Sequence, residues 1–309
     1  MSATAGDPGS ARGTDAGIRP DLTELIALRA RVRAWPPAGR GARGATGTTS
    51  RVRGRGMDYA ESRPYAAGDD ARHIDWRLTA RSGRAHTKIF HAERERVTLV
   101  VCDTAPAMYF GTRVCFKSVQ AARAAALVAW AAQRSGDRIA VLRGGSEPPV
   151  RPAGGSRGAL RALDAFARFY AVRPADDAGL DPALAAAGRL LHPGSRVVLT
   201  ADAASLEAVS DARLSLLAAH HDLIVLLLAD PLELAPPAAR LAFSAGGERH
   251  LLDLAGASGR QRWQARFGDT IEAARARLVR LGAIARVLRT DESPEAILPL
   301  LLAGAPEAA

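Results

Sequence analysis

The sequence has no apolar run long enough to cross a bilayer. Its longest apolar segments, residues 124–132 and 223–229, fall well short of the ~18–20 residues that a spanning helix needs. The beginning of the sequence shows no basic segment followed by an apolar one, so no signal peptide is visible. We therefore expect a cytoplasmic protein.

Cysteine is scarce, and the familiar catalytic motifs are missing. Cys102 and Cys115 are too few for a disulfide framework or a clustered zinc site. The sequence contains neither a G-x-x-x-x-G-K-[ST] phosphate-binding loop nor a Gly-x-Ser-x-Gly nucleophile elbow. We therefore predict a protein that is not an enzyme and that does not bind nucleotide as P-loop proteins do.

Positive charge is abundant and uneven. The formal net charge is +10, and only two of the 42 basic residues are lysine. Residues 25–57 contain eight arginines and no acidic residue. Such a stretch attracts polyanions, with Arg51, Arg53 and Arg55 as possible contacts, although a solvated linker would have the same composition. Trp35 is its one aromatic residue, so it has no stacking platform for single-stranded nucleic acid.

The chain divides into three parts by composition. Residues 1–20 are small, polar and rich in glycine, which is typical of a flexible tail. Residues 21–96 hold a short helix over 21–35, the arginine-rich loop, and a segment dense in turn-forming residues that ends in a strand at 85–91. Residues 97–309 have the pattern of one large folded domain.

From residue 97 onward, predicted strands alternate with predicted helices. Apolar runs predict buried strands at 97–102, 138–142, 196–200, 222–229 and 284–288. Helical periodicity predicts helices at 118–134, 157–170, 181–191, 203–220, 261–282 and from residue 293. A weak strand is predicted at 250–254. This alternation indicates an α/β fold with a mostly parallel sheet and helices on both faces.

Three of these strands are followed at once by an aspartate, namely Asp103, Asp202 and Asp230. In an open α/β sheet, ligands bind beyond the carboxyl ends of the strands. If their strands are neighbours, Asp103 and Asp202 lie on one edge, where two carboxylates could bind Mg²⁺. The alternative is structural: Asp202 can cap the helix that follows it, and Asp103 can accept hydrogen bonds in a turn.

The most specific segment of the sequence is 54–88. It carries Arg-Pro-Tyr at 63–65, Gly-Asp-Asp at 68–70, Ile-Asp-Trp-Arg at 74–77 and Ala-Arg at 80–81. This order resembles the signature of the domain of unknown function 58 (DUF58) family. His221-Asp222 and Asp230-Pro231-Leu232-Glu233 extend the resemblance to about residue 233.

The resemblance implies a Rossmann-like von Willebrand A-type domain, with the N-terminal loop and strand segment packed against it. Members of the family are often encoded beside MoxR-type AAA+ ATPases. The resemblance therefore implies a protein-interaction module that acts as an adaptor or co-chaperone of such an ATPase. The alternative from the residues themselves is a polyanion binder, of nucleic acid or an anionic surface, through 25–57.

The signature segment alternates in charge, with two aromatic residues between the charged ones. Carboxylates and guanidinium groups at this spacing can pair with one another while the aromatics anchor the loop. The segment is thus either a structural clasp or, in part, an outward-facing docking surface. Its candidate residues are Arg63, Tyr65, Asp69, Asp70, Arg72, Asp75, Trp76 and Arg81.

The resemblance also implies a metal site that has degenerated. The von Willebrand A fold binds its metal through an Asp-x-Ser-x-Ser loop and an aspartate from a later loop. Asp103 and Asp202 match the two aspartates, but Ala105 and Ala107 stand where the serines should be. We therefore expect no cofactor, and at most weak Mg²⁺ binding.

Overall fold

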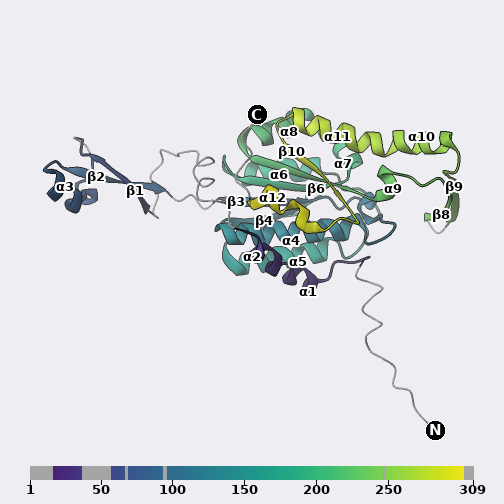
Figure 1. The fold of residues 1–309 in the computed structure, drawn as a ribbon, viewed down its shortest axis with the longest axis horizontal. Coiled ribbons are helices and arrows are strands. Elements are labelled where there is room, and N and C mark those ends of the chain that lie inside the picture. Colours follow the sequence, from purple (N-terminus) through teal and green to yellow (C-terminus); the bar gives the residue numbers. More distant parts are fainter. Residues whose placement is uncertain (1–16, 37–56, 67–68, 93–95, 246–247, 303–309) are drawn as a thin grey trace, which may run out of the picture. The chain divides into compact units, whose positions relative to one another are not determined.

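The computed structural model describes residues 17–36, 57–66, 69–92, 96–245 and 248–302 (Figure 1). Contacts divide the chain into two compact units. The larger comprises Met1–Pro37 with Arg96–Ala303, and the smaller comprises Ala38–Glu95 with Gly304–Ala309. The N-terminal helices thus group with the sheet, whereas the sequence analysis grouped residues 21–96 together. Each unit is described by itself.

The larger unit is built on a six-stranded sheet in the order β10-β7-β6-β3-β4-β5. Its strands are β3 (Val97–Cys102), β4 (Arg138–Arg143), β5 (Val150–Ala153), β6 (Arg196–Ala201), β7 (Asp222–Ala229) and β10 (Ile284–Arg289). Every pair is parallel except β4 with β5, which is antiparallel. The mostly parallel α/β sheet that the sequence predicts is therefore confirmed.

Helices cover both faces of this sheet (Figure 1). On one face lie α4 (Lys117–Ser135), α5 (Gly155–Phe169), η4 (Pro294–Ile297) and α12 (Leu298–Leu302). On the other lie α6 (Asp181–Leu190), α7 (Ala203–Glu207), α8 (Asp211–His220) and α11 (Gly268–Arg280). Alternate residues of each central strand enter the two cores, since successive side chains of a strand point to opposite faces. Val100, for example, belongs to the first core and Leu99 to the second.

The N-terminal helices form an outer layer on α4. They are α1 (Leu22–Ala27) and α2 (Arg29–Ala34), joined at Leu28. The indole nitrogen of Trp130 donates to the carbonyl oxygen of Leu25 at 3.0 Å, and Arg134 donates to the carbonyl oxygen of Trp35 at 2.9 Å. These contacts explain why α1 and α2 belong to the larger unit.

A hairpin and two helices lie beside the carboxyl edge of the sheet. The hairpin pairs β8 (Arg240–Ala245) with β9 (Glu248–Asp253) and is flanked by α9 (Pro231–Leu234) and α10 (Ala257–Arg266). The short helix η3 (Pro106–Tyr109) follows β3 at the same edge. Within the described ranges, no helix combines the length and apolar content that crossing a membrane requires.

The smaller unit is a hairpin with a short helix. Strand β1 (Met57–Pro64) pairs antiparallel with β2 (His86–Ala92), and between them lie η2 (Ala71–His73) and α3 (Trp76–Ser82). The signature segment is thus an ordered β-η-α-β element, although its turn-forming residues had suggested irregular structure up to residue 85.

Three of the predicted helices are broken in the structure. The helix expected over 21–35 divides at Leu28 into α1 and α2. The helix expected over 203–220 divides into α7 and α8, because the Ser210 side chain accepts a hydrogen bond from the Arg213 backbone and starts a new helix. The helix expected over 261–282 divides at Phe267, whose φ of −118° ends α10. Strands β1, β5 and β8 were not predicted.

Candidate functional site

The three aspartates at strand ends lie on one edge of the sheet, because β3, β6 and β7 are parallel neighbours. Asp103 connects two of the loops. Its Oδ2 accepts the backbone N–H of Asp202 at 2.9 Å, and its Oδ1 accepts that of Ala105 at 2.8 Å. Burial raises the pKa of the Asp103 carboxyl to about 6 despite these donors.

Asp202 has two structural roles. Its Oδ1 accepts the backbone N–H of Ala204 at 2.8 Å and so caps α7. Its Oδ2 accepts a hydrogen bond from Nζ of Lys117 at 2.5 Å, and the same ammonium group donates to Oε1 of Glu233 at 2.8 Å. Lys117 is only 1% exposed. We call Lys117, Asp202 and Glu233 the Lys117 cluster.

Sequence reasoning missed Lys117 and the role of Glu233. One signal was available: Lys117 is one of only two lysines in an arginine-rich chain, and it stands at the first position of a 19-residue helix. The partial positive charge of a helix N-terminus disfavours a cation there. A lysine at that place therefore indicates nearby carboxylates.

Glu233 is oriented by the start of α9. Its Oε2 accepts the backbone N–H of Asp230 at 2.8 Å, while Oδ1 of Asp230 accepts that of Leu232 at 3.0 Å, which completes a capping box. Fully buried Asp230 also accepts the hydroxyl groups of Thr112 at 2.5 Å and Thr290 at 2.7 Å. Asp230 therefore joins the loop before α4 to the ends of β7 and β10.

The charges of the Lys117 cluster stabilise one another. Burial by itself lowers the pKa of Lys117, but the carboxylates of Asp202 and Glu233 more than offset this and raise the pKa above its usual value. Burial raises the pKa of Glu233, and Lys117 opposes that rise.

A divalent cation does not fit this edge of the sheet. Asp103 and Asp202 are present, but their oxygens accept backbone and ammonium hydrogen bonds, and the side chains of Ala105 and Ala107 offer no ligand. The ammonium of Lys117 lies between the two carboxylates that would otherwise bind a cation. In the part of the chain that the structure describes, no three His, Cys, Asp or Glu side chains are grouped to hold a metal.

A cavity of about 480 Å³ opens above the Lys117 cluster. The cluster forms its polar floor, and most of its walls are aromatic and aliphatic side chains from η3, α7, the β8–β9 hairpin, α10 and α11. Three polar side chains also line it: His250, Arg266 and Thr270. Cavities of this size with a few polar groups are typical of ligand sites.

The acidic residues of the signature segment support its own fold. Asp75 caps α3 by accepting the N–H of Leu78 at 3.1 Å and accepts the hydroxyl group of Ser62 at 2.9 Å. Asp70 accepts the N–H of Arg72 at 2.9 Å, and Asp69 pairs with Arg63 at 2.7 Å.

Other signature residues face solvent. Trp76 is 69% exposed, and Tyr65, which donates to the carbonyl oxygen of Asp69 at 3.2 Å, is 39% exposed. The side chains of Arg72 and Arg81 are also exposed. The segment therefore combines a self-supporting hydrogen-bond network with an outward-facing aromatic residue.

The arginine-rich stretch is only partly described. Arg51, Arg53 and Arg55 lie outside the described residues. Arg31 pairs with Glu295 at 3.2 Å, and the guanidinium of Arg29 lies 5.1 Å from the ring centre of Trp130. These two arginines thus have contacts within the larger unit.

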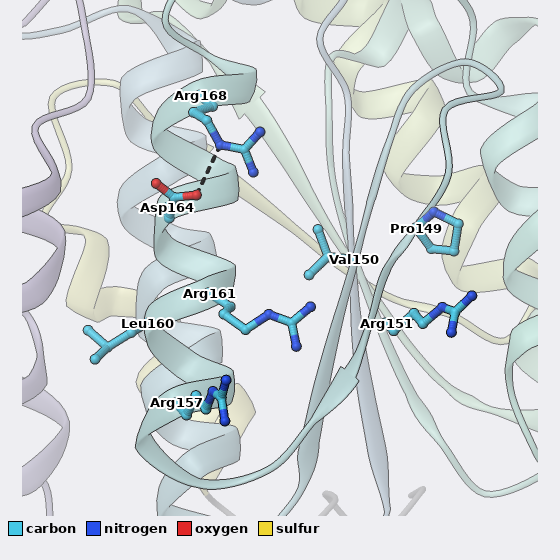
Figure 2. Close-up of a pocket in the computed structure, with 8 residues that line it drawn as sticks. All are labelled: Pro149, Val150, Arg151, Arg157, Leu160, Arg161, Asp164 and Arg168. Carbon is cyan, nitrogen blue, oxygen red and sulfur yellow. Dashed lines mark hydrogen bonds and ion pairs between the residues drawn. The ribbon is translucent and has the colours of Figure 1, made fainter.

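A basic groove lies elsewhere on the larger unit, between α5 and β5 (Figure 2). Its exposed arginines are Arg151, Arg157, Arg161 and Arg168, and its one acidic residue, Asp164, pairs with Arg168 at 3.0 Å. Arg161 extends from α5 toward the strand that carries Arg151 (Figure 2). The groove has a volume of about 820 Å³ and a clear excess of positive charge.

The fold and the sheet edge together define an α/β protein in which a buried lysine, Lys117, pairs with the strand-end carboxylate of Asp202 and with Glu233. The chain belongs to the DUF58 family, described as "Protein of unknown function DUF58", which matches residues 61–270. The matched range confirms the resemblance carried by the signature segment.

Two relatives in mycobacteria carry the description "uncharacterized protein". They are Rv1480 of Mycobacterium tuberculosis (strain ATCC 25618 / H37Rv) and Mb1516 of Mycobacterium bovis (strain ATCC BAA-935 / AF2122/97), each 37% identical over 91 residues. The match spans 29% of this chain and 29% of each relative. A solved structure, the conserved hypothetical protein BatB from Bacteroides thetaiotaomicron, is similar at 12% identity with a TM-score of 0.45, covering 67% of this chain and 95% of that one.

Replacing Lys117 by Met would leave Asp202 and Glu233 buried without their cation. The free energy of unfolding at pH 7 should fall by roughly 3–5 kcal/mol, as when one partner of a buried ion pair is removed. The loss should shrink as the pH is lowered from 7. Without Lys117 the pKa of Glu233, already raised by burial, rises further, and stability is regained as the carboxyl protonates below that pKa.

Urea unfolding at several pH values measures this difference. Arg168→Met is the matched control, because it removes an exposed ion pair and should change stability by less than about 1 kcal/mol. A Lys117→Met loss that is small, or that stays constant with pH, would contradict the assigned role of the cluster.

Millimolar Mg²⁺ should leave the melting temperature of the protein unchanged relative to EDTA, because Lys117 takes the place of a bound cation. A ligand raises the melting temperature only if it binds the native state. Lys117→Ala serves as the comparison, since it frees two carboxylate oxygens that approach a common point. Scanning fluorimetry should detect Mg²⁺-dependent stabilisation in the variant alone; stabilisation of the unaltered protein would show this account to be wrong.

Proposed function

We propose that this protein is a non-catalytic interaction module that acts as an adaptor or co-chaperone of a MoxR-type AAA+ ATPase in the assembly or maturation of other proteins. The family has no assigned function, so the proposal joins the resemblance of the signature segment to the geometry of the site. An ATP-consuming partner of this kind would place the complex in the cytoplasm.

The chemistry of the sheet edge supports a non-catalytic role. The strand-end carboxylates accept backbone, hydroxyl or ammonium hydrogen bonds, so none stands ready as a general base. Burial raises the pKa of the Cys102 thiol to about 12, and the pKa of Cys115 is also raised, so neither is a ready nucleophile.

The observation that carries the interaction role is Trp76. It stands at the start of α3, within the family signature, and is 69% exposed although Asp75 fixes the helix beneath it. Exposed tryptophan is costly to leave in water and is enriched among residues that dominate protein interfaces. A docking contact accounts for its place in an otherwise self-supporting segment.

The first test is binding to the MoxR-type ATPase of the same organism. The ATPase should be recovered by affinity capture from nuclease-treated lysate with ATP and Mg²⁺, and the purified proteins should bind and alter the rate of ATP hydrolysis. Trp76→Ala should weaken binding about tenfold or more, as expected of a tryptophan hot spot. Binding is measured by calorimetry and unfolding by urea.

Val172→Ala is the control, because Val172 is 72% exposed and lies outside the signature. It should leave affinity unchanged. If the purified protein neither binds the ATPase nor alters its activity, the adaptor function is wrong; if Trp76→Ala binds normally, the docking contact is elsewhere.

The second candidate function is polyanion binding. The basic groove on α5 and β5 favours it, in addition to the composition of residues 25–57. Guanidinium groups that contact phosphates release counterions, so affinity should fall steeply with salt.

Three variants separate the sources of such binding. Arg157→Gln with Arg161→Gln tests the groove, Arg51→Gln with Arg53→Gln and Arg55→Gln tests the stretch, and Arg173→Gln with Arg189→Gln removes exposed charge elsewhere. Titration of fluorescent single-stranded RNA should show a salt slope reduced by about one per lost phosphate contact in the responsible variant. Effects that follow only the number of charges removed, two, three and two in these variants, would indicate net charge alone and exclude a site.

A further inference from the structure

The cavity above the Lys117 cluster has an aromatic wall that is already in place. The rings of Trp263 and Phe267 are 4.3 Å apart between centroids, and Phe243 stacks on Trp263 at 6.2 Å. The indole nitrogen of Trp263 donates to the carbonyl oxygen of Leu232 at 2.8 Å, which fixes the ring across α9 and α10. A preformed wall lowers the entropic cost of binding.

The wall offers apolar surface to a ligand. The N–H of Trp263 is already donated to Leu232, so the indole offers the ligand no hydrogen bond, and Phe110, Phe243 and Ile271 add further apolar surface. A flat apolar group, such as an aromatic ring, matches this lining.

The floor of the cavity offers a hydrogen-bond donor. The ammonium of Lys117 has three N–H groups. Two are donated to Asp202 and Glu233, and the contact with the Phe110 ring, 5.7 Å from its centroid, is not a hydrogen bond. The third N–H therefore needs an acceptor. An apolar ligand without an acceptor would displace water from this N–H and leave it unpaired, which lowers the binding affinity.

The charge of the floor excludes a carboxylate as that acceptor. Nζ of Lys117 is flanked by the carboxyl groups of Asp202 and Glu233, whereas Arg266 and His250, which also line the cavity, are exposed. An entering anion would be repelled in a poorly solvated site. The acceptor that fits the third N–H of Lys117 is therefore a neutral group. A hydroxyl group is suited to this place because it can also donate a hydrogen bond to a carboxyl oxygen of Asp202 or Glu233.

We propose that this cavity is the receptor for a tyrosine side chain of a protein partner, with the ring against the Trp263 wall and the phenol oxygen accepting a hydrogen bond from Lys117. The proposal rests on the interaction function above, but its first test does not use the ATPase. A failure of the tyrosine site is therefore distinguished from a failure of the adaptor function.

The test is an NMR titration that follows the indole N–H signals. The four tryptophans give four such signals, and Trp263→Phe identifies the one from the cavity wall. The probes are p-cresol, toluene, 4-methylbenzoate and the blocked peptide acetyl-Gly-Tyr-Gly-amide, with acetyl-Gly-Phe-Gly-amide as its partner. We expect p-cresol and the tyrosine peptide to shift the Trp263 signal. Each should bind about tenfold more tightly than its analogue without a hydroxyl group, because the analogue leaves the buried N–H donor of Lys117 unpaired.

Two matched variants locate the binding. Ala204 and Ala208 are both exposed and belong to the α7 segment, but only Ala204 lines the cavity. Ala204→Leu should fill the cavity and weaken binding of p-cresol at least tenfold, whereas Ala208→Leu should leave it unchanged.

Several results would overturn the proposal. They are no shift of the Trp263 signal with any probe, binding of 4-methylbenzoate or toluene as tight as that of p-cresol, and unchanged binding in Ala204→Leu. Binding of p-cresol without binding of the tyrosine peptide would also overturn it, because the cavity would then serve a free phenolic molecule rather than a partner side chain.

Discussion

The contact of the Lys117 ammonium with Asp202 and Glu233 organises the carboxyl edge of the sheet. It joins the start of α4 to the loops after β6 and β7, and Asp103 and Asp230 extend the same network by accepting backbone and threonine donors. Buried charges of this kind are tolerated only when each is paired and hydrogen-bonded. The positions of the loops after β6 and β7 relative to the start of α4 therefore depend on the cluster remaining complete.

An internal cation changes what the sheet edge can recognise. A bound metal ion retains open coordination positions and attracts anionic groups, whereas an ammonium saturated on two sides offers a single remaining donor. The two carboxyl groups beside Lys117 and the aromatic wall then favour neutral, partly apolar groups. Ala105 and Ala107, whose side chains offer no ligand atoms, and Lys117 are consistent parts of one arrangement.

Most strands could be predicted because each is a short apolar run, which by itself indicates a buried strand. Apolar runs such as Val97–Cys102 form buried parallel strands wherever helices cover both faces. Strand β5 was not predicted because Pro149 and Pro152 favour turns. It can contain a proline because it is an edge strand, where only one side needs backbone N–H donors for pairing. The strand-end aspartates were also predictable. The pairing of Lys117 with Glu233 and the cavity above it were not, because the residues that form them lie far apart in the sequence and no local pattern links them.

The N-terminal helices carry a consequence for how the chain matures. Leu25 meets Trp130 only after 105 further residues have been added, and the smaller unit lies between them in sequence. During synthesis, α1 and α2 must therefore wait with their apolar faces uncovered while that unit and β3 emerge. The contact of these helices with α4 therefore forms late and between segments far apart in the sequence. Until it forms, the exposed apolar faces make the nascent chain prone to aggregation.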